Sequence, residues 1–244
     1  MFLNRVGPGG AVIRPVVGLD SPYLPAAIEL LQTIFPEYKH YVPYVRACAL
    51  QQSPSHPATF DHVWVVEQQG KYVAFRIFSY LYARNFAHDA FVGILEPYRN
   101  QGLGSWLVEQ TVAQLCADAE AFGQPPPLGY CAEIDFPDAE NPAKIKLWEE
   151  RLAFYRKCGS IFLNVDYYEP PMIHNVDYIT PDDLDGIQPQ PMQLVFHPTT
   201  PRTTLTTAEL ETVIEGMYLD VYRLEPDSWY VRRALDSIRV RGEE

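Results

Sequence analysis

The pattern of apolar and polar positions along the chain predicts an α/β protein. HVWVVE (62–67) and YVAFRIFSYLY (72–82) flank the turn residues QQGK, which is typical of a β-hairpin. In chain order, the predicted elements are a strand at 11–17, helices at 25–35 and 40–51, strands at 62–67, 72–82 and 90–95, a helix after 104 to about 121, a strand at 128–135, a helix at 143–158 and a strand at 161–168. This order predicts a mixed central sheet flanked by helices.

The pattern changes after residue 170, so we expect a domain at 1–170 and a C-terminal extension at 171–244. Within the extension we predict one strand, at 192–196. Thr206 and Glu209 have the spacing of a capping box at a helix start, and an apolar stripe at helical spacing follows from Leu210 to Leu224. Because such a stripe is rarely left in water, it should dock on the rest of the chain or form a homodimer contact.

Composition narrows the function classes. The chain has 19 Lys plus Arg against 31 Asp plus Glu, a net charge of −12, which argues against a nucleic-acid surface. A cationic small substrate fits this charge, although a solvated acidic surface would give the same number. No apolar run is long enough for a membrane span, and the first residues do not resemble a secretory signal.

The cysteines and histidines do not indicate a metal site. Cys48, Cys116, Cys131 and Cys158 share no CxxC spacing, and the six histidines form no HxH or HxxxH pair. We interpret the cysteines as reduced, mostly buried thiols, which together with the missing signal favours a cytoplasmic protein.

The stretch RNQGLG (99–104) lies where a strand should lead into a helix. The first turn of a helix presents backbone N–H groups without partners and a partial positive charge, which together favour anions. Two glycines allow close approach of the backbone, and an arginine supplies a fork-shaped donor for phosphate oxygens. The segment lacks the third glycine of a dinucleotide fingerprint and the Gly-Lys-Ser/Thr of a P-loop.

At these residues the sequence resembles the GCN5-related N-acetyltransferase (GNAT) family. ILEPYRNQGLGSWLVEQ is similar to the acetyl-CoA motif of that family, and LAFYRKCGS is similar to its later aromatic-Tyr segment. The resemblance covers about residues 1–170 and implies a GNAT-like acyl-CoA N-acyltransferase fold that uses acetyl-CoA without a metal. It implies that pantetheine and pyrophosphate are held by Gly93, Ile94, Leu95, Arg99, Asn100, Gln101, Gly102, Leu103, Gly104 and Ser105.

The resemblance also implies a catalytic acid. Tyr155 would protonate the departing thiolate, although its helical stripe equally suits a tyrosine of the core. The family often has Asn about seven residues earlier, where this chain has Trp148. Asn141 would then take over the cofactor contact, or the contact would be absent.

The sequence does not identify one catalytic base. Strand alternation places Glu133 and Asp135 on one face, where Glu133 could accept the amine proton or bind an ammonium, or serve as a buried structural acid. Glu96 is the reserve candidate. His88 and Asp89 are expected at the surface, in a loop or at a strand edge.

These residues predict an N-acetyltransferase that acts on a primary amine of a small molecule by direct attack. Two alternatives use the same features: a transferase for longer acyl chains from CoA or a carrier protein, and a CoA-binding regulatory module without turnover. The sequence does not identify the acceptor.

Overall fold

A computed structural model describes residues 6–51, 58–171 and 188–241. The chain divides into two compact units, Met1–Pro127 and Leu128–Glu244, which are described separately. The sequence-based division into 1–170 and 171–244 stays a prediction. Among the described residues, no helix combines the length and hydropathy that a membrane crossing requires.

In the residues that the structure describes, the first unit is built on four antiparallel strands in sequence order. Gln69 and Gly70 both have positive φ (51° and 74°), as the predicted two-residue hairpin turn between β2 and β3 requires. The strands are β1 Val12–Pro15, β2 Thr59–Gln68, β3 Lys71–Leu81 and β4 Phe86–Ile94. A strand was predicted at each of these positions, and the predicted strands for β2 and β4 were shorter than the observed ones.

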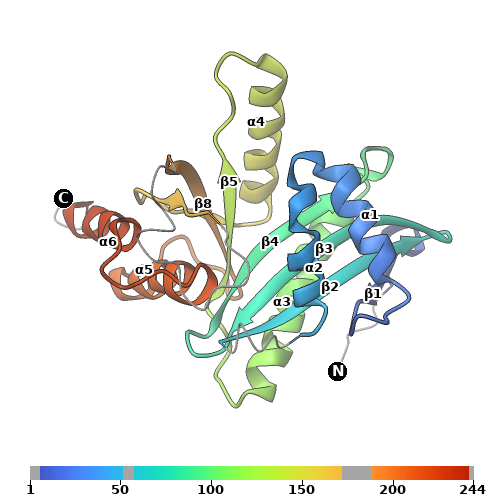
Figure 1. The fold of residues 1–244 in the computed structure, drawn as a ribbon, viewed down its shortest axis with the longest axis horizontal. Helices are drawn as coiled ribbons and strands as arrows, with labels where there is room; N and C mark the ends of the chain where they lie inside the picture. The colour runs from blue at the N-terminus through green and yellow to red at the C-terminus, as the bar shows by residue number, and fades with distance from the viewer. Residues whose placement is uncertain (1–5, 52–57, 172–187, 242–244) are drawn as a thin grey trace. The chain divides into compact units, whose positions relative to one another are not determined.

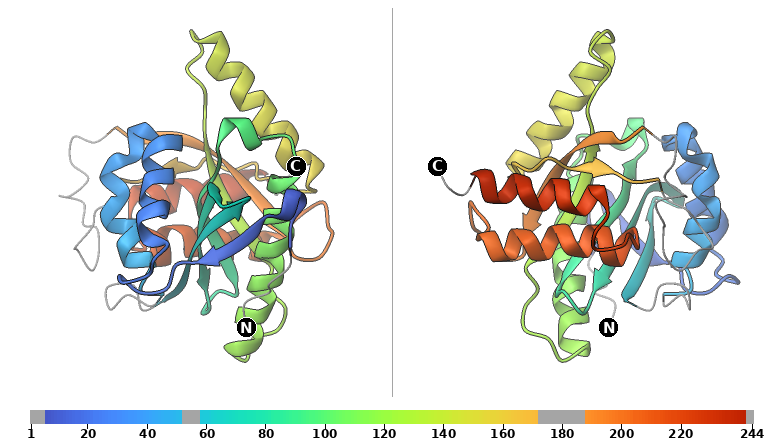
Figure 2. Two further views of the ribbon diagram at one scale, coloured as in Figure 1. Left: turned by 90° about the vertical axis from the view of Figure 1, so that its right-hand side faces the viewer. Right: turned by 60° about the vertical axis from the view of Figure 1, so that its left-hand side comes forward.

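Helices cover both faces of this sheet (Figures 1 and 2). α1 (Leu24–Ile34) and α2 (Val42–Cys48) lie on one face, and the longer α3 (Leu103–Ala121) lies on the other. Pro43 stands in the first turn of α2, as expected for a residue without an N–H donor. The described part of the unit also contains the short 3₁₀ segments η1 Pro8–Gly10, η2 Pro36–Tyr41 and η3 Glu96–Tyr98.

Charged groups are buried in pairs between these layers. The Arg76 guanidinium donates to both carboxylate oxygens of Asp89, at 3.0 and 2.8 Å, and both side chains are about 1% exposed. His88 is 2% exposed in the same strand. The expectation that His88 and Asp89 lie at the surface was therefore wrong. Asp89 is tolerated inside because Arg76, from the neighbouring strand, neutralises it.

The second unit contains β5 (Gly129–Asp135), β6 (Ile161–Phe162), β7 (Tyr168–Glu169) and β8 (Gln190–Pro198). β8 pairs with β5 along its length and with β6 and β7 on its other side, all antiparallel. The predicted strand at 192–196 is thus present and longer. The continuous strand predicted at 161–168 was wrong, because the chain bends between β6 and β7, where the Asp166 N–H donates to Ser237.

Helices pack on both faces of this second sheet as well. α4 (Pro142–Lys157) contributes Leu152 and Tyr155 to an apolar cluster with Ala132 and Ile134 of β5. α5 (Thr207–Glu215), the π-helical turn η5 (Gly216–Val221) and α6 (Trp229–Arg241) follow β8 in the chain, and α5 and α6 lie side by side (Figure 2). The apolar stripe predicted from Leu210 to Leu224 docks inside this unit, where Val213, Ile214, Met217 and Leu224 are buried.

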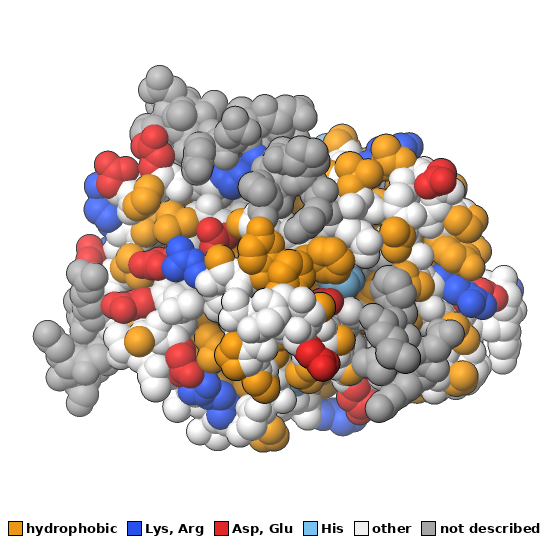
Figure 3. Space-filling view, turned by 90° about the horizontal axis from the view of Figure 1, so that it is seen from below, with side chains coloured by type: hydrophobic (Ala, Val, Ile, Leu, Met, Phe, Trp, Pro, Cys, Tyr) orange, Lys and Arg blue, Asp and Glu red, His pale blue; other side chains and the backbone are white. Residues whose placement is uncertain are grey.

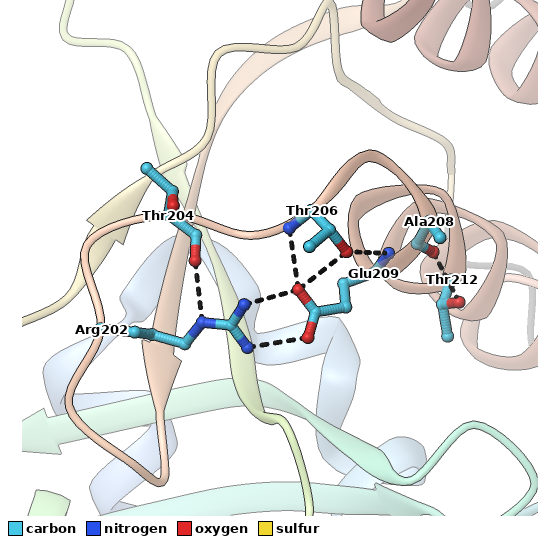
Figure 4. Close-up of polar contacts among 6 residues, drawn as sticks. All are labelled: Arg202, Thr204, Thr206, Ala208, Glu209 and Thr212. Carbon is cyan, nitrogen blue, oxygen red and sulfur yellow. Dashed lines mark hydrogen bonds and ion pairs between the residues drawn. The ribbon is translucent and has the colours of Figure 1, made fainter.

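The start of α5 shows how the extension is anchored locally (Figure 4). The Thr206 hydroxyl accepts from the Glu209 N–H, and the Glu209 carboxylate accepts from the Thr206 N–H, so the predicted capping box is confirmed. Arg202 donates two hydrogen bonds to the same carboxylate, at 2.8 and 2.6 Å. These donors lower the pKa of Glu209 to about 2.

The four cysteines are free thiols in different surroundings. Cys48 and Cys131 are buried, whereas Cys158 is half-buried and Cys116 is exposed on α3. The interpretation as reduced thiols is consistent with this, but the expected burial was wrong for Cys116. Cys116 is not among the buried residues of α3, and it lies on the side of that helix that faces away from the sheet.

Asp61 in β2 is a buried acid, and its burial predicts how the stability of the protein depends on pH. Burial raises its pKa to about 6, against opposing hydrogen bonds from Ser79 and Thr59. The folded protein therefore binds this proton more tightly than the unfolded chain, so this group's contribution to stability is complete below pH 4 and falls as pH rises to about 6. Asp61→Asn should gain stability relative to wild type over that range, by up to about 3 kcal/mol at pH 7.

Urea unfolding at a series of pH values measures this difference. Asp227→Asn, at an exposed carboxylate, is the control and should differ from wild type by a constant amount. A constant difference for Asp61→Asn would show that its carboxylate titrates normally in the folded state.

Candidate functional site

The start of α3 is an exposed helix N-terminus without a side-chain cap. Gly102 occupies the N-cap position with φ 85°, and no side chain accepts from the first turn. The first intrahelical bond of the new turn is the Trp106 N–H to the Gly102 carbonyl, at 3.1 Å. The N–H groups of Leu103, Gly104 and Ser105 precede that bond, so they are the donors that an anion would meet.

The loop before this helix is held by its own side chains. Arg99 Nε donates to the Ile94 carbonyl at 3.0 Å, and Gln101 Nε2 donates to the Pro97 carbonyl at 2.9 Å. Asn100 has φ 60°, a conformation that few residues other than Gly and Asn adopt readily. The side chains of Arg99 and Gln101 therefore hold the loop, and the bond to Ile94 fixes the position of the Arg99 guanidinium.

The end of β4 brings backbone groups next to that loop. The Leu95 N–H donates to Val73 at 2.9 Å, so it is engaged with β3. Strand alternation then directs the carbonyl and N–H of Ile94 away from β3, and the carbonyl meets Arg99. Gly93 is small for a packing reason, since a Cβ there would come within 2.9 Å of Ile34.

Tyr155 lies on the apolar face of the second sheet. Its side chain is 6% exposed, in a cluster with Ala132, Ile134, Leu152 and Val195. Trp148, which stands where the family often has Asn, packs against the same cluster. This burial fits a tyrosine of the core as well as an acid in a dry site, so the role of Tyr155 stays a prediction.

Glu133 faces the opposite side of β5, among tyrosines. The Tyr167 hydroxyl donates to Glu133 Oε1 at 2.6 Å, and the Tyr222 hydroxyl is 3.0 Å from each oxygen of the same carboxylate. Glu133 is partly exposed, while both tyrosines are 2% exposed. The two phenol hydroxyls therefore hold the carboxylate in one orientation, while part of the side chain stays accessible.

A second carboxylate adjoins this pair. Glu169 Oε1 lies 3.4 Å from the Tyr222 hydroxyl. Burial raises the pKa of Glu169 to about 8, with further contributions from the charges of Glu133 and Asp135, against the hydrogen bond from Tyr222. Asp135 itself is exposed at the end of β5. At neutral pH the Glu169 carboxyl is therefore mostly protonated.

Sequence reasoning did not find Tyr167, Glu169 or Tyr222. Their distances along the chain from Glu133 are 34 residues for Tyr167 and 89 for Tyr222, and no spacing rule connects such positions. The one local signal is the acidic residue that follows the Tyr pair in DYYEPP, at the end of a predicted strand.

The structure also locates the remaining candidates, Asn141 and Glu96. The Asn141 side-chain oxygen accepts from the Lys144 N–H at 3.2 Å and so caps α4. Glu96 is exposed in η3. Among the described residues, no three His, Cys, Asp or Glu side chains gather in a way that could hold a metal ion.

Chemically, the described residues offer two separate capabilities. The first unit presents a helix start with a nearby arginine, which suits a diphosphate or a similar anion. The second unit presents an oriented carboxylate supported by phenols, which suits binding an ammonium ion or accepting its proton.

Comparison with known proteins gives these features a context. Residues 59–159 match the family model described as an acetyltransferase (GNAT) domain. That range includes RNQGLG, Glu133 and Tyr155. No protein with a curated description matches the chain significantly.

Solved structures share the fold. A GNAT-family acetyltransferase from Bacteroides thetaiotaomicron has 18% identity and a TM-score of 0.51, with 87% of this chain and 99% of that chain covered. An aminoglycoside 6′-N-acetyltransferase complexed with coenzyme A has 15% identity and a TM-score of 0.50, with 79% and 99% covered. The predicted fold class, a mixed sheet flanked by helices, is confirmed by these similarities.

Proposed function

We propose that this chain, which belongs to the GNAT acetyltransferase family and is an acyltransferase, transfers an acetyl group from acetyl-CoA to a primary amine of a small molecule. The observation that carries the proposal is the uncapped start of α3, with Arg99 fixed beside it, inside the segment that matches the family. A helix N-terminus of this kind suits the pyrophosphate of CoA. We also propose that the protein is cytoplasmic and that its reaction needs no metal ion.

The cofactor would be bound by the groups at the β4–α3 junction. The N–H groups of Leu103, Gly104 and Ser105 face an anion at the helix start, and Arg99, Asn100, Gln101 and Gly102 shape the approach. The backbone of Gly93, Ile94 and Leu95 would carry the pantetheine arm, with Ile94 directing its groups away from β3. Asn141 is the predicted further contact, although its side-chain oxygen already caps α4.

The raised pKa values of two thiols favour direct attack by the amine over a covalent acyl-enzyme. Burial raises the pKa of the Cys48 thiol well above its ordinary value, and burial also raises that of Cys116. A covalent acyl-enzyme would need a thiol with a lowered pKa or an adjacent base. In the direct route, the amine nitrogen attacks the thioester carbon, the C–S bond breaks, and Glu133 accepts the amine proton. Tyr155 packs on the other face of β5, so its predicted role as proton donor to the thiolate is tested separately from that of Glu133.

Glu133 also suggests which amines are accepted. Acidic side chains are scattered singly over the face drawn in Figure 3, so on that face the net charge of −12 does not form a single patch. The carboxyl groups of Glu133, Glu169 and Asp135 are a more specific feature, because they gather acceptor oxygens that could bind an ammonium group. We infer that cationic amines, including polyamine-like and aminoglycoside-like molecules, are the preferred acceptors.

Cofactor binding tests the proposal first. Arg99→Ala combined with Gly104→Val removes the fixed cation and places a branched side chain at the helix start. Calorimetry with acetyl-CoA should show affinity reduced about tenfold or more, because a hydrogen bond to a charged group contributes about 1.5–3 kcal/mol. Arg46→Ala, at an exposed arginine of α2, is the control and should bind like wild type. Equal affinities for all three proteins would refute this binding site.

Tyr155→Phe tests the proton donor, because it removes one hydroxyl and keeps the ring in its apolar cluster. We expect kcat to fall about 10²–10⁴-fold, the usual range for a positioned acid, with acetyl-CoA affinity and melting temperature nearly unchanged. Tyr230→Phe is the matched control, since the Tyr230 hydroxyl is buried without a hydrogen-bond partner among the described residues. Wild-type turnover by Tyr155→Phe at saturating substrate would show that Tyr155 is a core residue.

Glu133→Gln tests the acceptor and separates the two candidate bases. We expect a higher KM and a lower kcat for cationic amines, with a smaller effect on neutral amines, whereas Glu96→Gln should resemble wild type. Rates with cationic acceptors should also fall as salt increases, because exposed charges are screened over about 8–10 Å. If Glu96→Gln alone lost activity, the base would be Glu96.

The same assays distinguish the alternative functions. Turnover of longer acyl-CoA donors only would favour a transferase for longer acyl chains, and binding without turnover would favour a CoA-binding regulatory module.

A further inference from the structure

The segment GPGG (residues 7–10), which contains η1, packs against the start of α3. The Pro8 ring contacts Gly102, since a Cβ added to Gly102 would lie 3.3 Å from the Pro8 Cγ. On the same side, a Cβ on Gly7 would collide with the ring of Trp106. Gly102 and Trp106 are joined by the first hydrogen bond of α3. The GPGG segment therefore contacts both ends of the first helical turn.

The GPGG segment is itself held in place by hydrogen bonds. The Gly7 N–H donates to the Ala11 carbonyl at 2.7 Å, which closes the segment into a turn before β1. The Pro8 carbonyl accepts two hydrogen bonds, from the Ala11 N–H at 3.1 Å and from Gln68 Nε2 at 3.0 Å. Both lone pairs of this carbonyl are thus engaged, and the Pro8 ring that contacts Gly102 is held in one position.

Gln68 connects this segment to the end of β2. Its side chain is 5% exposed, and Gly9 leaves room for it, because a Cβ on Gly9 would collide with Gln68 Nε2. Gly9 has φ 61°, a conformation that glycine adopts without strain. A chain of contacts therefore runs from Gln68 in the sheet, through Pro8, to the N-cap of α3.

The N-cap of α3 is a position where such a contact matters for ligand binding. Gly102 has no side chain, and no side chain caps the first turn. Glycine is the residue with the greatest backbone freedom, and a ligand that has to order a mobile backbone binds more weakly. A proline ring, whose own backbone is restricted, limits that freedom at Gly102 before the ligand arrives. The N–H groups that follow Gly102 are thereby aligned in advance.

Resting on the proposed function, we propose that Gln68 and Pro8 are positioning residues of the acetyl-CoA site. Gln68 holds Pro8 through its carbonyl, and Pro8 holds the Gly102 N-cap, so that the first N–H groups of α3 are aligned for the diphosphate of CoA. Pro8 lies before residues 59–159, the range that matches the family model. This part of the cofactor site is therefore supplied by the segment in front of β1.

Gln68→Met and Pro8→Ala test this by calorimetry with CoA. Methionine keeps the length of the buried side chain but cannot donate, and alanine keeps the carbonyl of residue 8 but removes the ring. Each variant should bind CoA about two- to tenfold more weakly than wild type, the effect of one lost hydrogen bond or a similar loss of preorganisation. The double variant should lose less than the product of the two single effects, because Gln68 acts through Pro8. Gln69→Met, at the exposed neighbouring residue, is the control and should bind like wild type.

Kinetics separate positioning from a general loss of stability. In both variants KM for acetyl-CoA should rise, whereas kcat should stay as in wild type, as should kcat/KM for acetyl-pantetheine, a donor without the diphosphate. Wild-type CoA affinity in both variants, an equal loss with acetyl-pantetheine, or fully multiplicative effects in the double variant would each overturn the proposal. A wild type that binds CoA but acetylates no amine would instead refute the proposed function, while the calorimetric comparison would still decide the positioning.

Discussion

The alternation of side chains along β5 is the constraint on which the second unit depends. Ala132 and Ile134 point to one face, where they pack with Tyr155 and its neighbours, and Glu133 points to the other. A single strand therefore separates a dry apolar cluster from a polar network of phenols and carboxylates. A shift of one residue in the register would bury Glu133 in the apolar cluster and expose Ile134, and the carboxylate would lose its phenol partners.

The pairing of β5 with β8 explains why the C-terminal region belongs to this unit. β8 pairs along the full length of β5, from Gly129 opposite Pro198 to Asp135 opposite Met192. The same strand holds β6 and β7 on its other edge, so β8 lies between elements that precede it in the chain. The helices after β8 then return to the Glu133 face and deliver Tyr222. The C-terminal region thus shares a sheet with β5 and supplies a contact to Glu133.

Local patterns predicted the elements well wherever one stretch of sequence contained the whole signal. The QQGK turn, the RNQGLG helix start and the Thr206–Glu209 capping box are contained within four to six residues, and all three are found. Burial of charge was not predictable in this way. Asp89 looked like a surface residue because its partner, Arg76, lies on the neighbouring strand.

The candidate site was predictable only in part for the same reason. The helix start and the alternation of β5 follow from neighbouring residues, so the surroundings of RNQGLG and the face of Glu133 could be anticipated. The partners of Glu133 are Tyr167, just before β7, and Tyr222, just after η5, which only tertiary structure brings together. At the bend that splits 161–168 into two strands, the Asp166 N–H likewise donates to a distant group, the Ser237 hydroxyl.

Product analysis tests the central claim of acetyl transfer most directly. The protein is incubated with [1-¹³C]acetyl-CoA and a panel of cationic and neutral primary amines, and the products are analysed by mass spectrometry and ¹³C NMR. The account predicts an N-acetylated cationic amine formed in a one-to-one ratio with free CoA, with no acyl group left on the protein. Release of acetate only, or a stable acyl-protein, would contradict it.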